Sequence, residues 1–224
     1  MKTRVSPWLA LPLLLLAGCP DGGGGEDGGF EETAPTGVAV SPNGSFLYVS
    51  NRGLNNVSAY TIGGAGALTP ITGSPFPVGL NPSAVTVSPN GSFLYVSNQG
   101  ADTVSAYTIG GAGALIPIIS IGSPFPVGAG PSAVTVSPNG DFLYASNQGS
   151  NNVSAFTITA GTGVLVPLVS GVGNPFAAGT SPSAVTVSPN GSFLYVSNQG
   201  SNNVSAYTIT AGTGVLAPIA GSPF

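Results

Sequence analysis

Short runs of apolar and β-branched residues, separated by turns rich in glycine, proline and asparagine, recur along the chain from residue 35 to residue 224. Within one such run, Phe93 and Tyr95 alternate with Leu94 and Val96, so a strand there has two apolar faces. No segment in this region keeps an apolar period of 3.6 residues. The pattern therefore predicts short β-strands and no helix, and one unit of it contains strands at 84–87, 93–98, 104–109 and 115–119.

The same unit is present four times. The tetrapeptide Ser-Pro-Asn-Gly begins at Ser41, Ser88, Ser137 and Ser188, with spacings of 47, 49 and 51 residues. Segments 82–100 and 182–200 are identical over nineteen residues. Proline at the second position of this tetrapeptide presets φ, and glycine at the fourth accepts a left-handed backbone, which predicts a type I turn with a bulge between the first two strands of each unit.

The repeat length and the strand count indicate the architecture. A single four-stranded sheet with two apolar faces is not stable alone and needs neighbours on both sides. Repeats of about 40–50 residues with four strands are typical of a β-propeller, in which each repeat is one blade. A linear β-solenoid is the alternative, although its coils are usually shorter. The predicted fold is an all-β propeller of four-stranded antiparallel blades at 35–81, 82–130, 131–181 and 182–224.

The number of blades does not decide how the propeller closes. Four blades are compatible with a partial ring, a four-bladed ring or part of a larger ring. An open set of blades would expose two apolar end faces, and such patches mark an interface or an aggregation risk. We therefore expect self-association in which two chains pair to close a larger ring. A truncated sequence explains the same observation.

The strings Phe-Leu-Tyr-Val-Ser-Asn at 93–98 and Val-Ser-Ala-Tyr at 104–107, preceded by Ser-Pro-Asn-Gly at 88–91, resemble YVTN-type propeller repeats. That superfamily also contains the lactonase-like, or 6-phosphogluconolactonase-like, seven-bladed propellers, together with surface-layer proteins. The resemblance covers residues 35–224 and implies the fold. Lactonase-like enzymes use clustered His, Arg and carboxylate side chains in the central funnel. This chain has no His, so the resemblance assigns no catalytic residue here.

The first 34 residues have a different character. Residues 1–18 begin with Lys2 and Arg4 and continue as an apolar run of about 13 residues, too short to cross a bilayer of ~30 Å as a helix. This is typical of a signal peptide. The run ends in Leu16-Ala17-Gly18-Cys19, which resembles the lipobox of bacterial lipoproteins and implies that Cys19 becomes the acylated N-terminus. An ordinary secretory signal is the alternative, and residues 19–34, rich in glycine and acids, are predicted to be a flexible tether.

Charge is scarce and excludes several function classes. The chain has 3 Lys and Arg, 7 Asp and Glu and no His, or 4% charged residues, against about 25% in a typical domain. Beyond residue 34 the charges are Arg52, Asp102 and Asp141. These numbers exclude a Ser-His-Asp triad, a His metal site and a Walker P-loop, and one cation cannot neutralise a nucleic-acid backbone. We expect no cofactor, no metal, no nucleic acid and no paired-carboxylate site.

The candidate binding face follows from the topology of a blade. Loops between the second and third strands share one end of the blades with the links to the next blade. That end would present Asn51, Arg52, Asn98, Gln99, Asn147, Gln148, Asn198 and Gln199, beside the Pro-Phe pairs at 75–76, 124–125, 175–176 and 223–224. Carboxamides beside such surfaces suit neutral polar ligands such as glycans or peptides. Turn chemistry, with each Phe tucked into its blade, is the alternative explanation.

The leading interpretation is a non-catalytic scaffold for a neutral ligand or partner protein, held by lipid on Cys19 at an extracytoplasmic membrane face of the bacterial cell envelope. A lactonase-like hydrolase is the first alternative, and a passive surface-layer-type structural protein is the second. Because the blades are nearly uncharged, ligand binding is expected to be almost insensitive to salt.

Overall fold

The computed structural model describes residues 34–120, 122–168 and 174–224. The predicted leader, Cys19 and the predicted tether up to residue 33 lie outside these ranges. Within the ranges, regular structure consists of β-strands without helix, which confirms the predicted all-β fold. No helix in this part of the chain is long and apolar enough to cross a membrane.

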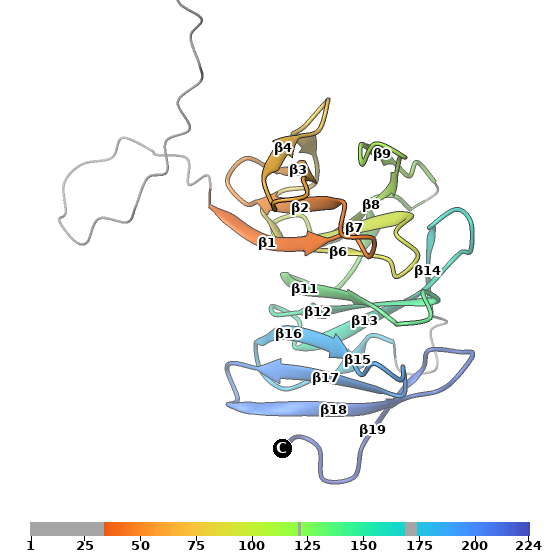
Figure 1. Cartoon of the computed structure of the whole chain (residues 1–224). Helices are drawn as coiled ribbons and strands as arrows, with labels where there is room; N and C mark the ends of the chain where they lie inside the picture. The colour runs from red at the N-terminus through yellow and green to blue at the C-terminus, as the bar shows by residue number, and fades with distance from the viewer. Residues whose placement is uncertain (1–33, 121, 169–173) are drawn as a thin grey trace, which may run out of the picture. The chain divides into compact units, whose positions relative to one another are not determined.

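The strands form four antiparallel sheets, one for each repeat (Figure 1). The first sheet contains β1 (Pro35–Val40), β2 (Phe46–Asn51), β3 (Asn56–Ile62), β4 (Leu68–Pro70) and β5 (Phe76–Pro77). The second contains β6 (Pro82–Val87), β7 (Phe93–Asn98), β8 (Thr103–Ile109), β9 (Leu115–Pro117) and β10 (Phe125–Pro126). The third contains β11 (Pro131–Val136), β12 (Phe142–Asn147), β13 (Asn152–Ile158), β14 (Leu165–Pro167) and β15 (Phe176–Ala177). The fourth contains β16 (Pro182–Val187), β17 (Phe193–Asn198), β18 (Asn203–Ile209) and β19 (Leu216–Pro218). We refer to these sheets as blades 1 to 4.

The turn between the first two strands of each blade has the predicted geometry. In blade 2 the amide of Gly91 donates to the carbonyl of Ser88 over 2.8 Å, and Gly91 has a φ of 72°. The side chain of Asn90 reinforces the turn, because its Oδ1 accepts from the Ser88 hydroxyl at 2.6 Å and from the Ser92 amide at 3.0 Å. These contacts explain why Ser, Asn and Gly recur together in this tetrapeptide.

In blades 1 to 3 the outer edge differs from the prediction, which for blade 2 was one strand at 115–119. In blade 2 it is split into β9 and β10, which pair with opposite halves of β8. Prolines in and beside these segments lack an N–H, so each can add only a short stretch of ladder. The predicted link to the next blade, which contains the Pro-Phe pair at 124–125, thus contributes to the edge through Phe125 and Pro126. Phe125 within it is 2% exposed, because its ring fills the space between blades.

The hydrophobic cores lie between consecutive blades. In the core between blades 2 and 3, Tyr95 and Val104 of one blade pack with Leu143 and Phe156 of the next. Corresponding clusters join blades 1 and 2 and blades 3 and 4. Blades 2 and 3 are thus covered on both faces and blades 1 and 4 on one face each, the stacking of consecutive blades that confirms the propeller architecture.

Two kinds of hydrogen bond recur at each junction between blades. The first lies between inner strands: the hydroxyls of Thr36, Ser83 and Ser132 donate over 2.7 Å to the carbonyl of the first residue of the next inner strand. The second lies at the opposite end of the strands: Tyr48, Tyr95 and Tyr144 donate from their hydroxyls to glycine carbonyls of the next blade, at Gly113, Gly163 and Gly214, over 2.9, 3.0 and 2.9 Å. The three junctions within the chain are therefore copies of one interface.

Candidate ligand-binding face

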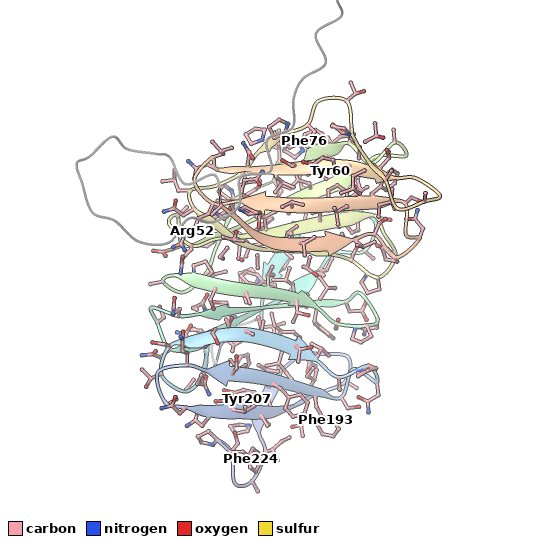
Figure 2. All side chains as sticks on the ribbon, turned by 60° about the vertical axis from the view of Figure 1, so that its left-hand side comes forward. Arg52, Tyr60, Phe76, Phe193, Tyr207 and Phe224 are labelled. Carbon is pink, nitrogen blue, oxygen red and sulfur yellow. The ribbon has the colours of Figure 1, made fainter. Side chains whose placement is uncertain are left out.

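All eight predicted site residues lie at one end of the strands. Each asparagine is the last residue of β2, β7, β12 or β17, and the arginine or glutamine follows it. Figure 2 shows Arg52 at this end and Phe193, the first residue of β17, at the opposite end. The loops that follow the second strand of each blade thus gather the predicted residues on one face.

The asparagines are tied into the corners of their own blades. Asn98 is fully buried, and its Nδ2 donates to the hydroxyls of Thr103 at 3.1 Å and Ser105 at 2.9 Å. Its Oδ1 accepts from the amide of Gly79 at 3.1 Å. Asn51, Asn147 and Asn198 make the corresponding Nδ2 contacts to the third strand of their blades. Their amide groups do not face solvent but stabilise the link between the second and third strands. This is what the alternative explanation, turn chemistry, requires of these asparagines.

The residues that follow the asparagines remain accessible and form a row across three blades. The Arg52 Nη2 donates to Gln99 Oε1 over 2.5 Å, and Gln99 Nε2 donates to Gln148 Oε1 over 3.1 Å. Gln199 holds the equivalent, exposed position in blade 4. We call Arg52, Gln99, Gln148 and Gln199 the Arg/Gln row. It combines one cation with amide donors and acceptors, a set that suits a hydroxylated, largely uncharged ligand.

A set of hydroxyls at the same end was missed by the sequence analysis. Thr36, Ser83, Ser132 and Ser183 occupy the second position of the inner strands. Ser83 Oγ lies 2.9 Å from Ser97 Oγ, in addition to its bond to the next blade. The available signal was a hydroxyl residue recurring after the first residue of each repeat. Sequence reasoning alone could not tell that these hydroxyls connect blades.

Blade 4 carries a depression at this end, with a volume of about 600 Å³. Ser183, Gln199, Asn203 and Phe224 are among the residues that line it. Phe224 is 65% exposed, whereas the equivalent Phe125 and Phe176 are buried in cores between blades. Of the four Pro-Phe pairs predicted to lie beside the carboxamides, the last therefore presents an exposed aromatic ring on this face.

The two acids of the blades are far apart in the topology. Asp102 lies in the loop after β7, where its Oδ1 accepts from the amide of Gly130 over 2.7 Å. Asn55 and Asn151 make the same bond to the following blade-to-blade link, so Asp102 has a structural contact. Asp141 precedes β12 at the opposite end and accepts from Asn139 Nδ2. In the described ranges, no group of three or more His, Cys, Asp or Glu residues could hold a metal ion.

The buried tyrosines do not supply an acid or base to the Arg/Gln row. Desolvation by burial raises the pKa of Tyr48 to about 12 and also raises the pKa of Tyr95 and of Tyr144. Their hydroxyls donate to carbonyls at the end of the blades opposite to the row. These groups stay neutral at ordinary pH and stabilise the junctions between blades.

Comparison with known proteins supplies a family. A family model described as "Lactonase, 7-bladed beta-propeller" matches residues 25–116, 71–177 and 114–223. A search of curated protein sequences gave no match.

Solved structures with the same fold include enzymes of different names. A putative 6-phosphogluconolactonase from Bacteroides fragilis is 24% identical, with a TM-score of 0.70 over 88% of this chain and 57% of that one. The periplasmic gluconolactonase PpgL of Pseudomonas aeruginosa is 24% identical, with a TM-score of 0.70 over 84% and 55%. Virginiamycin B lyase from Staphylococcus aureus is 19% identical, with a TM-score of 0.56 over 86% and 58%. The chain thus spans somewhat more than half the length of these proteins, and at such identities the likeness establishes the fold.

Proposed function

Because the chain belongs to the family of seven-bladed β-propeller lactonases, we propose that it binds a sugar lactone at the Arg/Gln row and promotes opening of the lactone ring. The observation that carries this proposal is the position of Arg52. It is the one cation of the described residues, and it is held in a row of amides at an accessible end of the blades. The names of two solved relatives, a putative 6-phosphogluconolactonase and a gluconolactonase, agree with a lactone as the substrate class.

The chemistry of the row fits a polyhydroxylated ester. A guanidinium donates several N–H bonds, and one nitrogen of Arg52 is occupied by Gln99. The remaining donors would bind the lactone carbonyl and stabilise the negative charge that develops on its oxygen during attack by water. Glutamine amides both donate and accept, so Gln99 and Gln148 would bind the sugar hydroxyls. After the acyl C–O bond breaks, the product carboxylate would pair with Arg52.

The scarcity of charge favours a neutral lactone over a phosphorylated one. Arg52, Asp102 and Asp141 are the charges of the described blades, so a phosphate group would meet a single cation. Binding of a neutral sugar lactone is then expected to change little with salt, because screening acts on charge pairs. A strong salt dependence of affinity would contradict the preference for a neutral ligand.

A specific observation supports a second candidate, the non-catalytic binding scaffold. The described residues offer no His, and the carboxylate of Asp102 already accepts a bond from the Gly130 amide. No general base is therefore placed beside Arg52 in these blades. Such a face would bind hydroxylated ligands without turning them over.

The experiment that separates these candidates measures both hydrolysis and binding. Opening of glucono-δ-lactone by the purified chain is followed by acid release, and binding of glucose, a neutral polyhydroxylated analogue that cannot be hydrolysed, is followed by calorimetry. Arg52→Gln is the decisive variant, because it gives blade 1 the residue that the other blades carry at this position. If Arg52 stabilises the developing oxyanion, the variant loses about 100-fold in kcat/KM.

Gln199→Arg in the Arg52→Gln background is the matched control, since it restores the charge on a different blade. Hydrolysis that is unchanged in Arg52→Gln would exclude the proposed role of Arg52. Binding without hydrolysis would favour the non-catalytic scaffold. A chain that neither binds nor hydrolyses would favour the surface-layer-type structural protein.

We also propose that lipid on Cys19 anchors the chain at an extracytoplasmic face of the bacterial cell envelope. The support is the Leu-Ala-Gly-Cys string at 16–19 directly after a short apolar run. More than one acyl chain on the same residue would give a durable anchor. Incorporation of labelled palmitate into the wild type, and its absence from Cys19→Ser, tests this directly. An unlabelled wild type would exclude the anchor without affecting the lactone proposal.

A further inference from the structure

The two end blades expose side chains whose equivalents are buried or half-buried at the junctions inside the chain. Val38 on β1 is 65% exposed, whereas Val134 at the same position of β11 is 7% exposed because it packs under blade 2. At the other end, Tyr195 on β17 is 39% exposed, whereas the equivalent Tyr95 is fully buried under blade 3. Further positions follow this rule: Val40 and Leu68 are exposed on blade 1, and Val204 is exposed on blade 4.

These two surfaces are the two complementary halves of one interface. We call the first the leading face (Val38, Val40 and Leu68 of blade 1) and the second the trailing face (Ser183, Phe193, Tyr195 and Val204 of blade 4). At internal junctions, residues equivalent to those of the leading face pack directly on residues equivalent to those of the trailing face, as Val134 and Leu165 do on Tyr95 and Val104.

The polar groups of the two faces match as well. Ser83 and Ser132 donate to the first carbonyl of the next inner strand. Ser183 bonds within its own blade to Ser197, and no further blade offers it a carbonyl among the described residues. The first inner strand begins with Pro35, whose position corresponds to the acceptors Pro82, Pro131 and Pro182.

A close contact between a glycine and a phenylalanine ring also recurs at each internal junction and, in the part of the chain that the structure describes, is absent at the end faces. Gly113 lies so close to the Phe46 ring of the preceding blade that an added Cβ would stand 2.5 Å from its Cδ1. Gly163 and Gly214 meet Phe93 and Phe142 in the same way. Gly66 of blade 1 has open space at this point, with nothing within 4 Å of an added Cβ. Phe193 of blade 4 is the ring that has no glycine of a following blade against it among the described residues.

We propose that a second copy of this chain covers these faces, with the leading face of each copy on the trailing face of the other. The two copies would form a closed head-to-tail pair through two identical junctions. Continuity with an interface already built three times in the chain points to this occupant, because a second copy presents the same valines, leucine, glycine and carbonyl in register. Pairing would also continue the Arg/Gln row around the axis, so that residues of both copies build the ligand-binding face.

The test is the mass of the full chain by light scattering at micromolar concentration, with Cys19→Ser in every sample to prevent acylation. A mass of two chains is expected. Val38→Asp places a charge on the leading face and Val204→Asp places one on the trailing face, and each variant alone is expected to have the mass of one chain. Ile119→Asp is the matched control, because Ile119 is exposed after β9 and belongs to neither face. It is expected to keep the mass of two chains.

Mixing the two variants tests the head-to-tail arrangement and the folding of both proteins together. Val38→Asp keeps an intact trailing face and Val204→Asp keeps an intact leading face, so an equimolar mixture is expected to recover a mass of two chains. A wild-type mass of one chain, or a ladder of larger assemblies, would overturn the proposal. Persistence of the pair in either single variant would also overturn it, because this would indicate contacts between like faces. Lactone hydrolysis is not read in this experiment, so its outcome is independent of the proposed function.

Discussion

Segments 82–100 and 182–200 have the same nineteen residues but different surroundings. Both fold into an inner strand, a tight turn and a second strand with the same register. In blade 2, Tyr95 lies beneath blade 3, donates to Gly163 and has a raised pKa. In blade 4 the identical Tyr195 is partly exposed, and no such bond is made among the described residues. Local sequence therefore sets the strands and the turn, whereas the neighbouring blade sets the burial of the side chains and their bonds between blades.

This difference bears on where stability resides. Each sheet is nearly identical, so the contribution of a given side chain depends on whether a blade follows it. Pairs of equivalent positions in internal and end blades give matched tests. In each pair below we use the Val38→Asp background, in which no second copy is expected to cover the end faces, and we measure the free energy of unfolding in urea.

The largest difference is expected between Tyr95→Ala and Tyr195→Ala. Removing the buried ring of Tyr95 leaves a cavity between blades 2 and 3 and is expected to cost about 3–5 kcal/mol. Removing the partly exposed ring of Tyr195 is expected to cost less than about 1 kcal/mol. Equal losses would show that burial by the next blade does not determine the contribution of this ring.

A smaller difference is expected between Gly113→Ala and Gly66→Ala. Both glycines have a left-handed backbone, with φ of 81° and 78°, so both variants carry similar strain. Only at Gly113 would the new methyl group collide with Phe46 and Ile71 of blade 1. Gly113→Ala is therefore expected to be less stable than Gly66→Ala by about 1–3 kcal/mol. If the two variants were equally stable, the close approach at Gly113 would carry no cost.

Alkaline pH is expected to weaken the junctions between blades. Burial raises the pKa of Tyr48 in the folded state to about 12, above its ordinary value of 10.0. The contribution of neutral Tyr48 to the stability of the fold is complete below pH 10 and is lost as pH rises from 10 towards 12. Over this range the tyrosine ionises in the unfolded chain while it stays neutral in the folded chain, which favours unfolding. The loss attributable to Tyr48 alone is on the order of 1–2 kcal/mol at pH 11. Unfolding at pH 9 and pH 11 measures it, and Tyr48→Phe should show a smaller drop than the parent chain.

The smallest difference is expected between Ser83→Ala and Ser183→Ala. Both serines bond to a serine of the neighbouring strand in their own blade, so both variants lose that contact. Only Ser83 also donates to Pro131 of the next blade. Ser83→Ala should therefore be less stable by about 1 kcal/mol, the net worth of one hydrogen bond. A larger loss in Ser183→Ala would contradict this assignment.

The sequence predicted the blades well because their determinants are local. The alternation at 93–98 and the Ser-Pro-Asn-Gly turn indicate strand and turn without reference to other segments. The split outer edge was not predicted, since a two-residue strand such as β10 is defined only by its pairing with β8. The structural role of Asn98 could not be predicted from the sequence either, because its burial depends on the link from the preceding blade, where the Gly79 amide donates to it. The Arg/Gln row has a local and a non-local part. The end of the strands at which it lies follows from local sequence and was predicted, whereas its hydrogen bonds between blades depend on neighbouring segments and were not.

The repetition of one junction also has an evolutionary consequence. Because each blade brings both halves of the same interface, a duplication or deletion of one whole repeat in the gene would leave every junction chemically unchanged. Unequal recombination between near-identical coding segments, such as those for residues 82–100 and 182–200, provides a route to such changes. We therefore expect natural variants of this protein to differ in length by steps close to the observed spacings of 47, 49 and 51 residues, with few insertions of other sizes inside a blade.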